Sequence, residues 1–172
     1  MNNWYIIFVL NKNMEKINEY LNKKGLNSFI PKRSVIFKRK QKRFIVNKAL
    51  FRNYIFVRSS MEQLEFVHLI NNLRSEITGI IKVLTYDKDG TPALKAEERE
   101  FLSRLFGDDL VVTTSCGYLV NDRVLITEGP LLGYDSKIVA LNKHKNYVKL
   151  AVDLFGRETF VEVPIEIIEK SE

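Results

Sequence analysis

The chain carries nine lysine and arginine residues, and no acidic residue, between Lys32 and Arg52. Positive charges at this density repel one another, and a phosphate backbone that binds among them relieves the repulsion. The densest part is a run of five candidate nucleic-acid-binding residues: Lys38, Arg39, Lys40, Lys42 and Arg43. A basic run is also typical of a solvated hairpin tip, so its charge alone leaves both interpretations open.

A second basic group is the short turn Lys143-His144-Lys145-Asn146. Residues 118–172 hold 7 Lys and Arg against 9 Asp and Glu, whereas residues 1–105 hold 20 against 10. A basic turn in an acidic segment is not explained by general charge, so we expect these four residues to be available to RNA. Loops of small barrels often bind RNA. We therefore expect further RNA contacts from Arg123 and from the loop residues Leu131, Leu132, Gly133 and Tyr134.

Catalysis has little support in the sequence. It contains no Gly-rich phosphate loop, no Gly-x-Ser-x-Gly elbow and no His-Glu-x-x-His helix. The single Cys116 cannot form an internal disulfide, and His68 and His144 are too few for a zinc site. We expect a protein that is not an enzyme and that uses no cofactor and no metal.

No apolar run approaches the roughly eighteen residues that span a bilayer. The apolar run Trp4–Leu10 is short and lacks a basic leader, unlike a signal peptide. We expect a cytoplasmic protein that makes no contact with a membrane.

Hydrophobic periodicity predicts the elements that position the basic residues. Residues 1–105 follow the order strand, helix, hairpin, helix, strand, helix, which favours an α+β fold with a ferredoxin-like antiparallel sheet and helices on one face. The first expected elements are a strand at Trp4–Val9, a helix capped by Asn13 and ended by Gly25, and a hairpin with Lys38–Arg43 at its tip. A second helix is expected to begin at a capping box of Ser60 and Gln63, with an apolar stripe of Leu64, Val67, Ile70 and Leu73. A strand at Ile77–Leu84 and a third helix, with an apolar stripe of Leu94, Phe101, Leu102 and Leu105, complete the order.

The rest of the chain predicts a small β-barrel over residues 118–172, after a linker at 106–117. Short strands are expected at 124–126, 138–139, 147–154 and 159–163, the last of them ended by Pro164. Gly129, Pro130 and Gly133 mark the tight loop between the first two.

Two motifs of the chain are more specific. Val-x-Ile-x-x-Gly-Pro-x-x-Gly-Tyr-Asp at 124–135, followed by Phe-Gly-Arg-Glu-Thr at 155–159, is similar to the KOW motif in the C-terminal SH3-like barrel of NusG-type transcription factors. Ser136 and Phe160 depart from that pattern, because many members carry glycine and proline there. Trp4-Tyr5 and the segment Leu50–Val57 resemble the N-terminal NGN domain, so the two resemblances together cover nearly the whole chain.

The resemblance implies a bacterial transcription elongation factor that acts as a monomer. Its NGN domain binds the clamp helices of RNA polymerase through large, stiff and partly exposed aromatic residues, and its action suppresses pausing and termination. The positions that match are Tyr5, Phe51 and Tyr54, and Trp4 and Phe56 are expected to support the same surface or lie beneath it. The basic hairpin is then expected to meet upstream DNA or nascent RNA.

Within the family, two details favour a specialised paralog. Arg52 replaces the usual proline of the middle motif, whereas Asn53 matches the form found in RfaH. The turn Asn142–Asn146 is similar to that of the LoaP group, in which the KOW domain binds an RNA hairpin. Two alternatives stay open: a general NusG factor whose barrel binds Rho or a ribosomal protein through residues that include the match to Phe155, and a ribosome-associated KOW protein that binds RNA.

Overall fold

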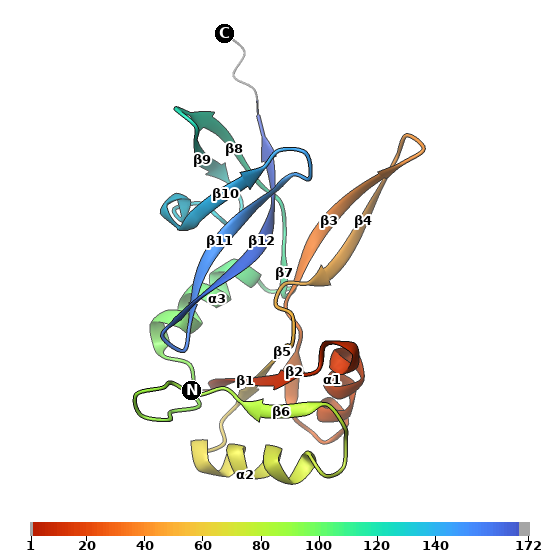
Figure 1. The fold of residues 1–172 in the computed structure, drawn as a ribbon, viewed down its shortest axis with the longest axis vertical. Helices are drawn as coiled ribbons and strands as arrows, with labels where there is room; N and C mark the ends of the chain where they lie inside the picture. Colours follow the sequence, from red (N-terminus) through yellow and green to blue (C-terminus); the bar gives the residue numbers. More distant parts are fainter. Residues whose placement is uncertain (1, 169–172) are drawn as a thin grey trace. The chain divides into compact units, whose positions relative to one another are not determined.

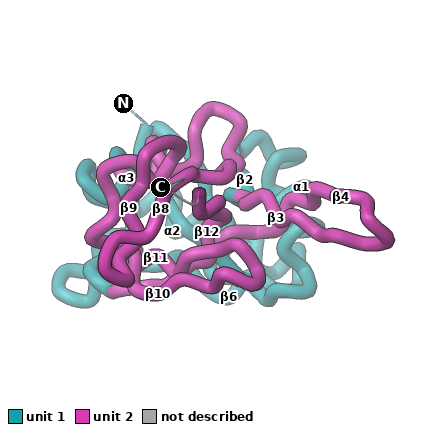
Figure 2. Tube along the Cα trace, turned by 90° about the horizontal axis from the view of Figure 1, so that it is seen from above, with its two compact units in different colours: residues 1–31, 51–100, 154–157 teal, residues 32–50, 101–153, 158–172 magenta. Residues whose placement is uncertain are grey.

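The computed structural model describes residues 2–168 and shows the expected α+β architecture (Figure 1). The chain forms two compact units, coloured separately in Figure 2. Unit 1 comprises residues 1–31, 51–100 and 154–157, and unit 2 comprises residues 32–50, 101–153 and 158–172. Each unit is therefore assembled from segments that lie far apart in the sequence.

Unit 1 is built on a four-stranded antiparallel sheet. Its strands, in the spatial order β2-β5-β1-β6, are β2 (Asn27–Phe29), β5 (Tyr54–Ser59), β1 (Asn3–Val9) and β6 (Ile80–Val83). Two helices, α1 (Met14–Lys23) and α2 (Gln63–Leu73), connect strands in this sheet. Helix, strand and hairpin therefore alternate as in a ferredoxin-like fold, which confirms the predicted fold class.

Helix α1 follows a single turn of 3-10 helix, η1 (Asn11–Asn13), and buries Met14, Ile17 and Leu21. It ends before Gly25, whose φ of +86° is the left-handed conformation predicted there. Asn13 occupies the N-cap position as predicted, but its side chain makes no capping hydrogen bond. Its Nδ2 instead donates to the Thr78 carbonyl oxygen at 3.0 Å.

The buried face of helix α2 is rotated by part of a turn from the predicted face. Phe66, Ile70 and Leu73 are buried, whereas Leu64 is 77% exposed. The helix begins after Glu62, without a side-chain cap, so the predicted capping box of Ser60 and Gln63 was wrong. Phe66 takes the inner position because spacings of four and three residues place it on the face of Ile70 and Leu73.

Unit 2 contains a long hairpin of β3 (Lys32–Arg39) and β4 (Lys42–Ala49), paired in register from Lys32↔Ala49 to Arg39↔Lys42. The two strands run side by side along their length in Figures 1 and 2. Lys40 and Gln41, with φ of 47° and 63°, make a two-residue turn that matches the twist of the strands. The predicted hairpin, with its basic tip, is confirmed.

The barrel of unit 2 is a five-stranded sheet in the order β10-β11-β12-β8-β9. The strands are β8 (Ser115–Val120), β9 (Arg123–Glu128), β10 (Ile138–Asn142), β11 (Tyr147–Leu154) and β12 (Arg157–Ile167), with a short 3-10 helix η2 (Asp135–Lys137) before β10. Strand β12 continues past Pro164, where it was predicted to stop. It continues because residues Ile165–Ile167 pair in parallel with Ser115–Gly117 of β8.

The remaining elements are α3 (Ala96–Phe106) and β7 (Val111–Val112). Leu102, Leu105 and Phe106 of α3 are buried. Strand β7 pairs in parallel with Lys32 and Arg33 of β3. The segment 106–117, predicted to be a linker, thus contains β7 and the first three residues of β8. Among residues 2–168, no helix is long and apolar enough to cross a membrane.

Candidate functional site

One side of the sheet in unit 1 carries a buried aromatic cluster. Trp4, Phe29, Phe51 and Phe56 are 0–6% exposed, and their ring centroids lie 5.5–6.4 Å apart along the Trp4–Phe29, Trp4–Phe56, Phe29–Phe56 and Phe51–Phe56 contacts. The Arg58 guanidinium lies over Trp4 and Phe29, 4.9 and 4.7 Å from their ring centroids. Three candidate polymerase-binding residues, Trp4, Phe51 and Phe56, are therefore parts of one hydrophobic core.

Tyr5 lies on the opposite side of the sheet, because successive strand residues point to opposite faces. Its ring stacks on Phe66 of α2, with 3.9 Å between centroids, and its hydroxyl donates to the Met61 carbonyl oxygen at 2.8 Å. Burial raises the pKa of its phenol. The expected partial exposure was wrong for Tyr5 and for Phe51, which are 0% and 3% exposed.

Tyr54 is the one candidate in this group that is partly exposed, and the structure pairs it with Phe8. Tyr54 stands directly opposite Phe8 in the β1–β5 register, and the two rings meet edge to face at 6.0 Å between centroids. Phe8 is also partly exposed, although our sequence reasoning missed it. The signal was available, since Phe8 follows Trp4 by four positions and so shares its strand face.

The five predicted basic residues of the hairpin, Lys38 to Arg43, are all exposed in unit 2. Two further cations, Arg33 and Lys48, lie at the base of the hairpin, opposite each other in the β3–β4 register. The Lys48 ammonium sits over the Phe37 ring, 4.8 Å from its centroid. Arg33 donates to the Glu162 carboxylate of β12 at 2.8 Å.

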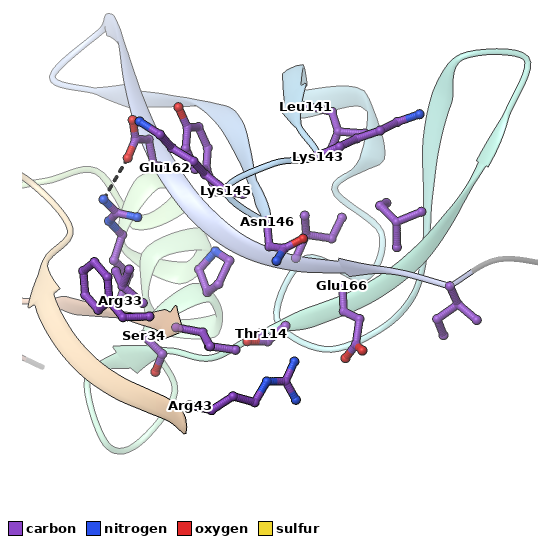
Figure 3. A pocket seen from close by; sticks show the side chains of 18 of the residues that line it. Arg33, Ser34, Arg43, Thr114, Leu141, Lys143, Lys145, Asn146, Glu162 and Glu166 are labelled. Carbon is purple, nitrogen blue, oxygen red and sulfur yellow. Dashed lines mark hydrogen bonds and ion pairs between the residues drawn. The ribbon is translucent and has the colours of Figure 1, made fainter. Parts of the chain in front are cut away.

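Unit 2 contains a cleft of about 880 Å³ between this hairpin, strands β8 and β12, and the turn before β11 (Figure 3). Arg33 is one of the residues that line it. Its cationic lining residues are Arg33, Arg43, Lys48, Lys143 and Lys145, and its acidic ones are Glu162 and Glu166. Phe37, Tyr118 and Tyr147 add aromatic rings, and Ser34, Thr114 and Asn146 add neutral polar groups. The cleft thus brings together two basic segments that are about a hundred residues apart in the sequence.

The turn that follows β10 is held in shape by its own hydrogen bonds. The Lys145 amide donates to Asn142 Oδ1 at 3.0 Å, and Asn146 adopts a φ of 52°. The Asn146 carbonyl oxygen accepts from the Ile165 amide of β12 at 3.0 Å. Residues 143–146 are all exposed as predicted, and three of them (all but His144) line the cleft.

The other predicted RNA-binding residues do not line the cleft. Arg123, Leu132 and Gly133 are exposed, and Tyr134 is half-buried against Phe101, with 4.8 Å between ring centroids. Leu131 is fully buried, and its amide donates to Ser115 Oγ at 3.0 Å. The side chain of Leu131 therefore belongs to the barrel core and is not available to RNA.

Gly129 explains the close fit of this loop. It adopts a φ of +98°, and a Cβ at this position would lie 2.7 Å from the Ser115 Cα. Only glycine therefore lets the loop approach β8. The glycine of this Gly-Pro pair is thus required by packing.

The turn between β11 and β12 is packed within unit 1. Phe155 is 4% exposed and meets the ring of Tyr86, while Arg157 Nε donates to Asp87 Oδ2 at 3.0 Å. The Gly156 amide donates to Glu98 Oε1 at 3.4 Å. Phe155, the residue through which a protein partner would bind in one alternative, is covered by these contacts.

No group of three or more His, Cys, Asp or Glu side chains suited to hold a metal ion occurs within residues 2–168. Cys116 is half-buried, and burial raises the pKa of its thiol, which disfavours the reactive thiolate.

Comparison with known proteins agrees with this description. The family model "Transcription termination factor nusG" matches residues 2–102. Two relatives named "Transcription termination/antitermination protein NusG", from Bacillus subtilis (strain 168) and Thermus thermophilus, are 24% and 26% identical, each over 98% of both chains. A solved structure titled "Domain interaction in Thermotoga maritima NusG" is similar over 95% of this chain and 94% of that one, with a TM-score of 0.50 and 22% identity, which shows a shared fold.

Proposed function

Because the chain belongs to the NusG family of transcription factors, we propose that it is a specialised antitermination factor of the LoaP and RfaH kind. It binds RNA polymerase through an NGN domain in residues 1–105 and contacts RNA through a KOW barrel in residues 118–172, with 106–117 between them. It performs no catalysis: binding shifts the polymerase toward its processive form, which disfavours pausing and termination.

The polymerase contact centres on Tyr54 and Phe8. They are the partly exposed rings on the aromatic side of the sheet, and aromatic side chains bury much area at low entropic cost. Phe51 and Phe56 support this pair from beneath, since Phe51 contacts the Tyr54 ring at 6.1 Å between centroids. The clamp helices of the polymerase are the expected partner.

RNA is favoured as the barrel's partner by a difference in exposure between two of its candidate binding sites. Phe155 is buried against Tyr86, whereas the basic turn Lys143–Asn146 is exposed. A barrel that recruited a protein through Phe155 would first have to break the contacts around it. The basic turn needs no such change before it meets phosphates.

The polymerase arm is tested with Tyr54→Ala combined with Phe8→Ala in the full chain. Removing two aromatic anchors costs on the order of 2 kcal/mol each when they are hot spots. The folded double variant should retain little core polymerase in a pull-down. A control variant, Leu132→Ala, removes an exposed apolar residue elsewhere and should bind normally. Unchanged binding by the double variant would refute the docking surface.

The RNA arm is tested by selecting RNA hairpins from a random pool with the full chain, followed by titration near physiological salt. Lys143→Ala with His144→Ala should weaken binding of the selected hairpin by roughly 1–3 kcal/mol, the scale of a single interaction with a base or phosphate. Lys16→Ala with His68→Ala removes the same residue types from exposed positions of α1 and α2 and serves as control. If no hairpin is enriched and the chain binds Rho or a ribosomal protein, it is a general elongation factor.

A further inference from the structure

Two phenylalanines of the β3–β4 hairpin, Phe37 and Phe44, are about half exposed. They stand directly opposite each other in the register and are 42% and 48% accessible to solvent. Large apolar side chains on a solvent-exposed hairpin contribute little to the fold, so a gathered set of them indicates a binding surface. Of the two rings, Phe37 lines the cleft.

Phe37 shares its side of the hairpin with Arg33. Arg33, Val35 and Phe37 alternate along β3 and share one side of the hairpin. Arg33 reaches Glu162 of β12 from that side, and Arg33, Val35 and Phe37 all line the cleft. Lys143 and Lys145 of the turn before β11 line the same cleft (Figure 3).

The charge of the cleft favours a polyanion. Five cationic side chains line it against two carboxylates, and one of these carboxylates, Glu162, is already paired with Arg33. The cations come from both walls: Arg43 and Lys48 from the hairpin, Lys143 and Lys145 from the turn. A backbone of phosphates that passes between the walls would meet positive charge on each side.

An aromatic ring between such walls distinguishes single strands from duplexes. Bases of a duplex are stacked on one another and hide their faces, whereas unpaired bases can stack on an aromatic side chain. Ser34, Thr114 and Asn146 also line the cleft, and their polar groups can hydrogen-bond the 2′-hydroxyl that RNA carries and DNA lacks.

We propose that this cleft binds a single-stranded stretch of RNA, with an unpaired base stacked on Phe37 and the adjoining phosphates held by Lys48 and Arg43 on one wall and Lys143 and Lys145 on the other. The inference rests on the proposed function, in which RNA is the partner of the barrel. It adds that the β3–β4 hairpin and the barrel bind the same strand, and that the strand is unpaired where they do so.

The test measures binding of the full chain to three fluorescent probes of one length: a 12-nucleotide oligouridylate, the deoxythymidylate of the same length and a 12-base-pair RNA duplex. Phe37→Leu keeps the apolar volume and removes the ring. A stacked base contributes about 1–3 kcal/mol, so this variant should bind oligouridylate about 5- to 150-fold more weakly. Its affinity for the duplex should not change, and Phe37→Tyr should bind like the unchanged protein.

Phe160→Leu is the matched control. Phe160 is also a half-exposed phenylalanine in unit 2, 46% accessible, with the Lys149 ammonium 4.3 Å from its ring centroid, but it does not line the cleft. Its replacement should leave all three affinities unchanged. Circular dichroism of each variant verifies that the fold is kept, which is expected for exposed positions.

The outcomes separate this inference from the proposed function. If Phe37→Leu binds oligouridylate like the unchanged protein, or if the duplex binds as tightly as the single strand, the cleft inference is overturned. Equal affinity for deoxythymidylate would overturn the assignment to RNA. The proposed function survives these results as long as a selected hairpin still depends on Lys143 and His144, and it fails by itself if that dependence is missing.

Discussion

The Phe155 ring meets the Tyr86 ring edge to face, with 5.0 Å between their centroids. This contact places the turn between β11 and β12 among the segments of unit 1. Arg157 and Asp87, which follow Gly156 and Tyr86 in the chain, add a hydrogen-bonded ion pair next to this aromatic contact. Phe155 and Gly156, with φ of 54° and 75°, form the two-residue turn that presents the ring.

We expect Phe155→Ala to destabilise the protein by about 3 kcal/mol or more, because it removes a ring that is almost completely buried. Urea unfolding followed by tryptophan fluorescence measures the effect, since the chain has a single tryptophan, Trp4, and it lies in unit 1. Phe160→Ala, at a half-exposed position, should change stability by less than about 0.5 kcal/mol. Equal effects of the two substitutions would show that the Phe155 contact does not form in solution.

Substitutions on the aromatic side of the sheet should have two different effects, one on stability and one on polymerase binding. Phe51→Ala empties a buried site and should cost about 3–5 kcal/mol of stability. Phe8→Ala removes a partly exposed ring, so it should reduce polymerase binding while the protein stays folded. Thermal unfolding and a polymerase pull-down, performed on both variants, separate the two roles. A stable Phe51→Ala variant would show that this ring is not part of the core.

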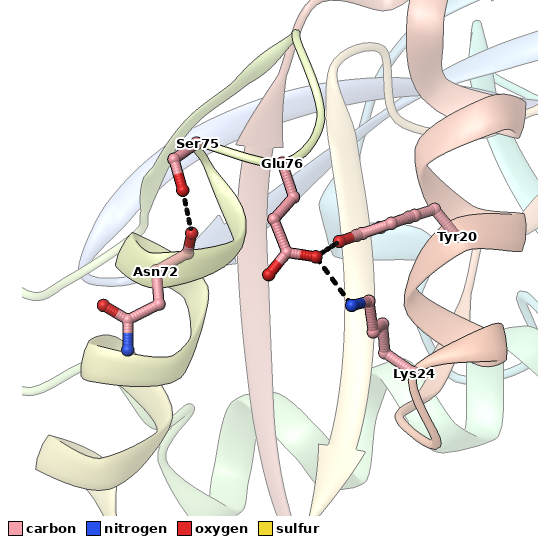
Figure 4. Close-up of polar contacts among 5 residues, drawn as sticks. All are labelled: Tyr20, Lys24, Asn72, Ser75 and Glu76. Atoms are coloured by element: carbon pink, nitrogen blue, oxygen red, sulfur yellow. Dashed lines mark hydrogen bonds and ion pairs between the residues drawn. The ribbon is translucent and has the colours of Figure 1, made fainter.

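The contact between Glu76 and α1 predicts a dependence of stability on pH. Glu76 accepts from Lys24 Nζ at 2.6 Å and from the Tyr20 hydroxyl at 2.5 Å (Figure 4). The hydrogen bond from Lys24, followed by that from Tyr20, lowers the pKa of the Glu76 carboxyl below its ordinary 4.5. A carboxylate with a lowered pKa in the folded state stabilises the fold above its unfolded pKa, and this stabilisation disappears as the pH falls through the folded pKa.

Glu76→Gln should therefore unfold at a lower urea concentration than the unchanged protein at neutral pH. The difference should shrink as the pH falls below 4.5 and disappear once the pH is below the lowered folded-state pKa of Glu76. The effect is expected to be small because the pair is exposed to solvent. Glu65→Gln, at an exposed position of α2, is the control and should show no such dependence. If Glu76→Gln still unfolds at a lower urea concentration than the unchanged protein at low pH, Glu76 is not the group responsible for the pH dependence.

The hairpin tip predicts a change in salt dependence. Replacing Lys38, Arg39, Lys40, Lys42 and Arg43 with serine should reduce affinity for nucleic acid and flatten its dependence on salt, by about 0.7–0.9 in the logarithmic slope for each phosphate that the variant no longer neutralises. The control removes the same charge from exposed positions of unit 1: Lys12, Lys16, Lys23, Lys82 and Lys88. An identical slope for both variants would mean that the tip is only solvated.

Strong periodicity made most of the fold predictable. The central strand β1 covered on both faces, the apolar face of α1, the left-handed Gly25 and the basic hairpin tip all follow from local sequence. The failures occurred where a distant partner decides the outcome. Strand β12 passes Pro164 because β8 pairs with it, and two valines after α3 become β7 because β3 lies beside them.

The charged residues of the candidate site were predictable from the sequence, but which of them line the cleft together was not. The exposure of Lys143 to Asn146 followed from their composition. The inclusion of Arg33 and Lys48 in the cleft, and the exclusion of Arg123, depend on how the hairpin lies beside β12. The aromatic residue type misled us at Tyr5, because a strand sends neighbouring side chains to opposite faces.

Strand β4 forms the outer edge of its sheet, and Phe44, Ile45 and Val46 on it are 43–71% exposed. Unpaired backbone groups beside apolar, β-prone side chains are a template for pairing with another copy of the chain. Lys42, Arg43 and Lys48 flank this segment, and charges in such positions oppose aggregation. The serine variant of the hairpin tip should therefore be less soluble as well as weaker in binding. The positive charge that attracts phosphates also keeps copies of the protein apart.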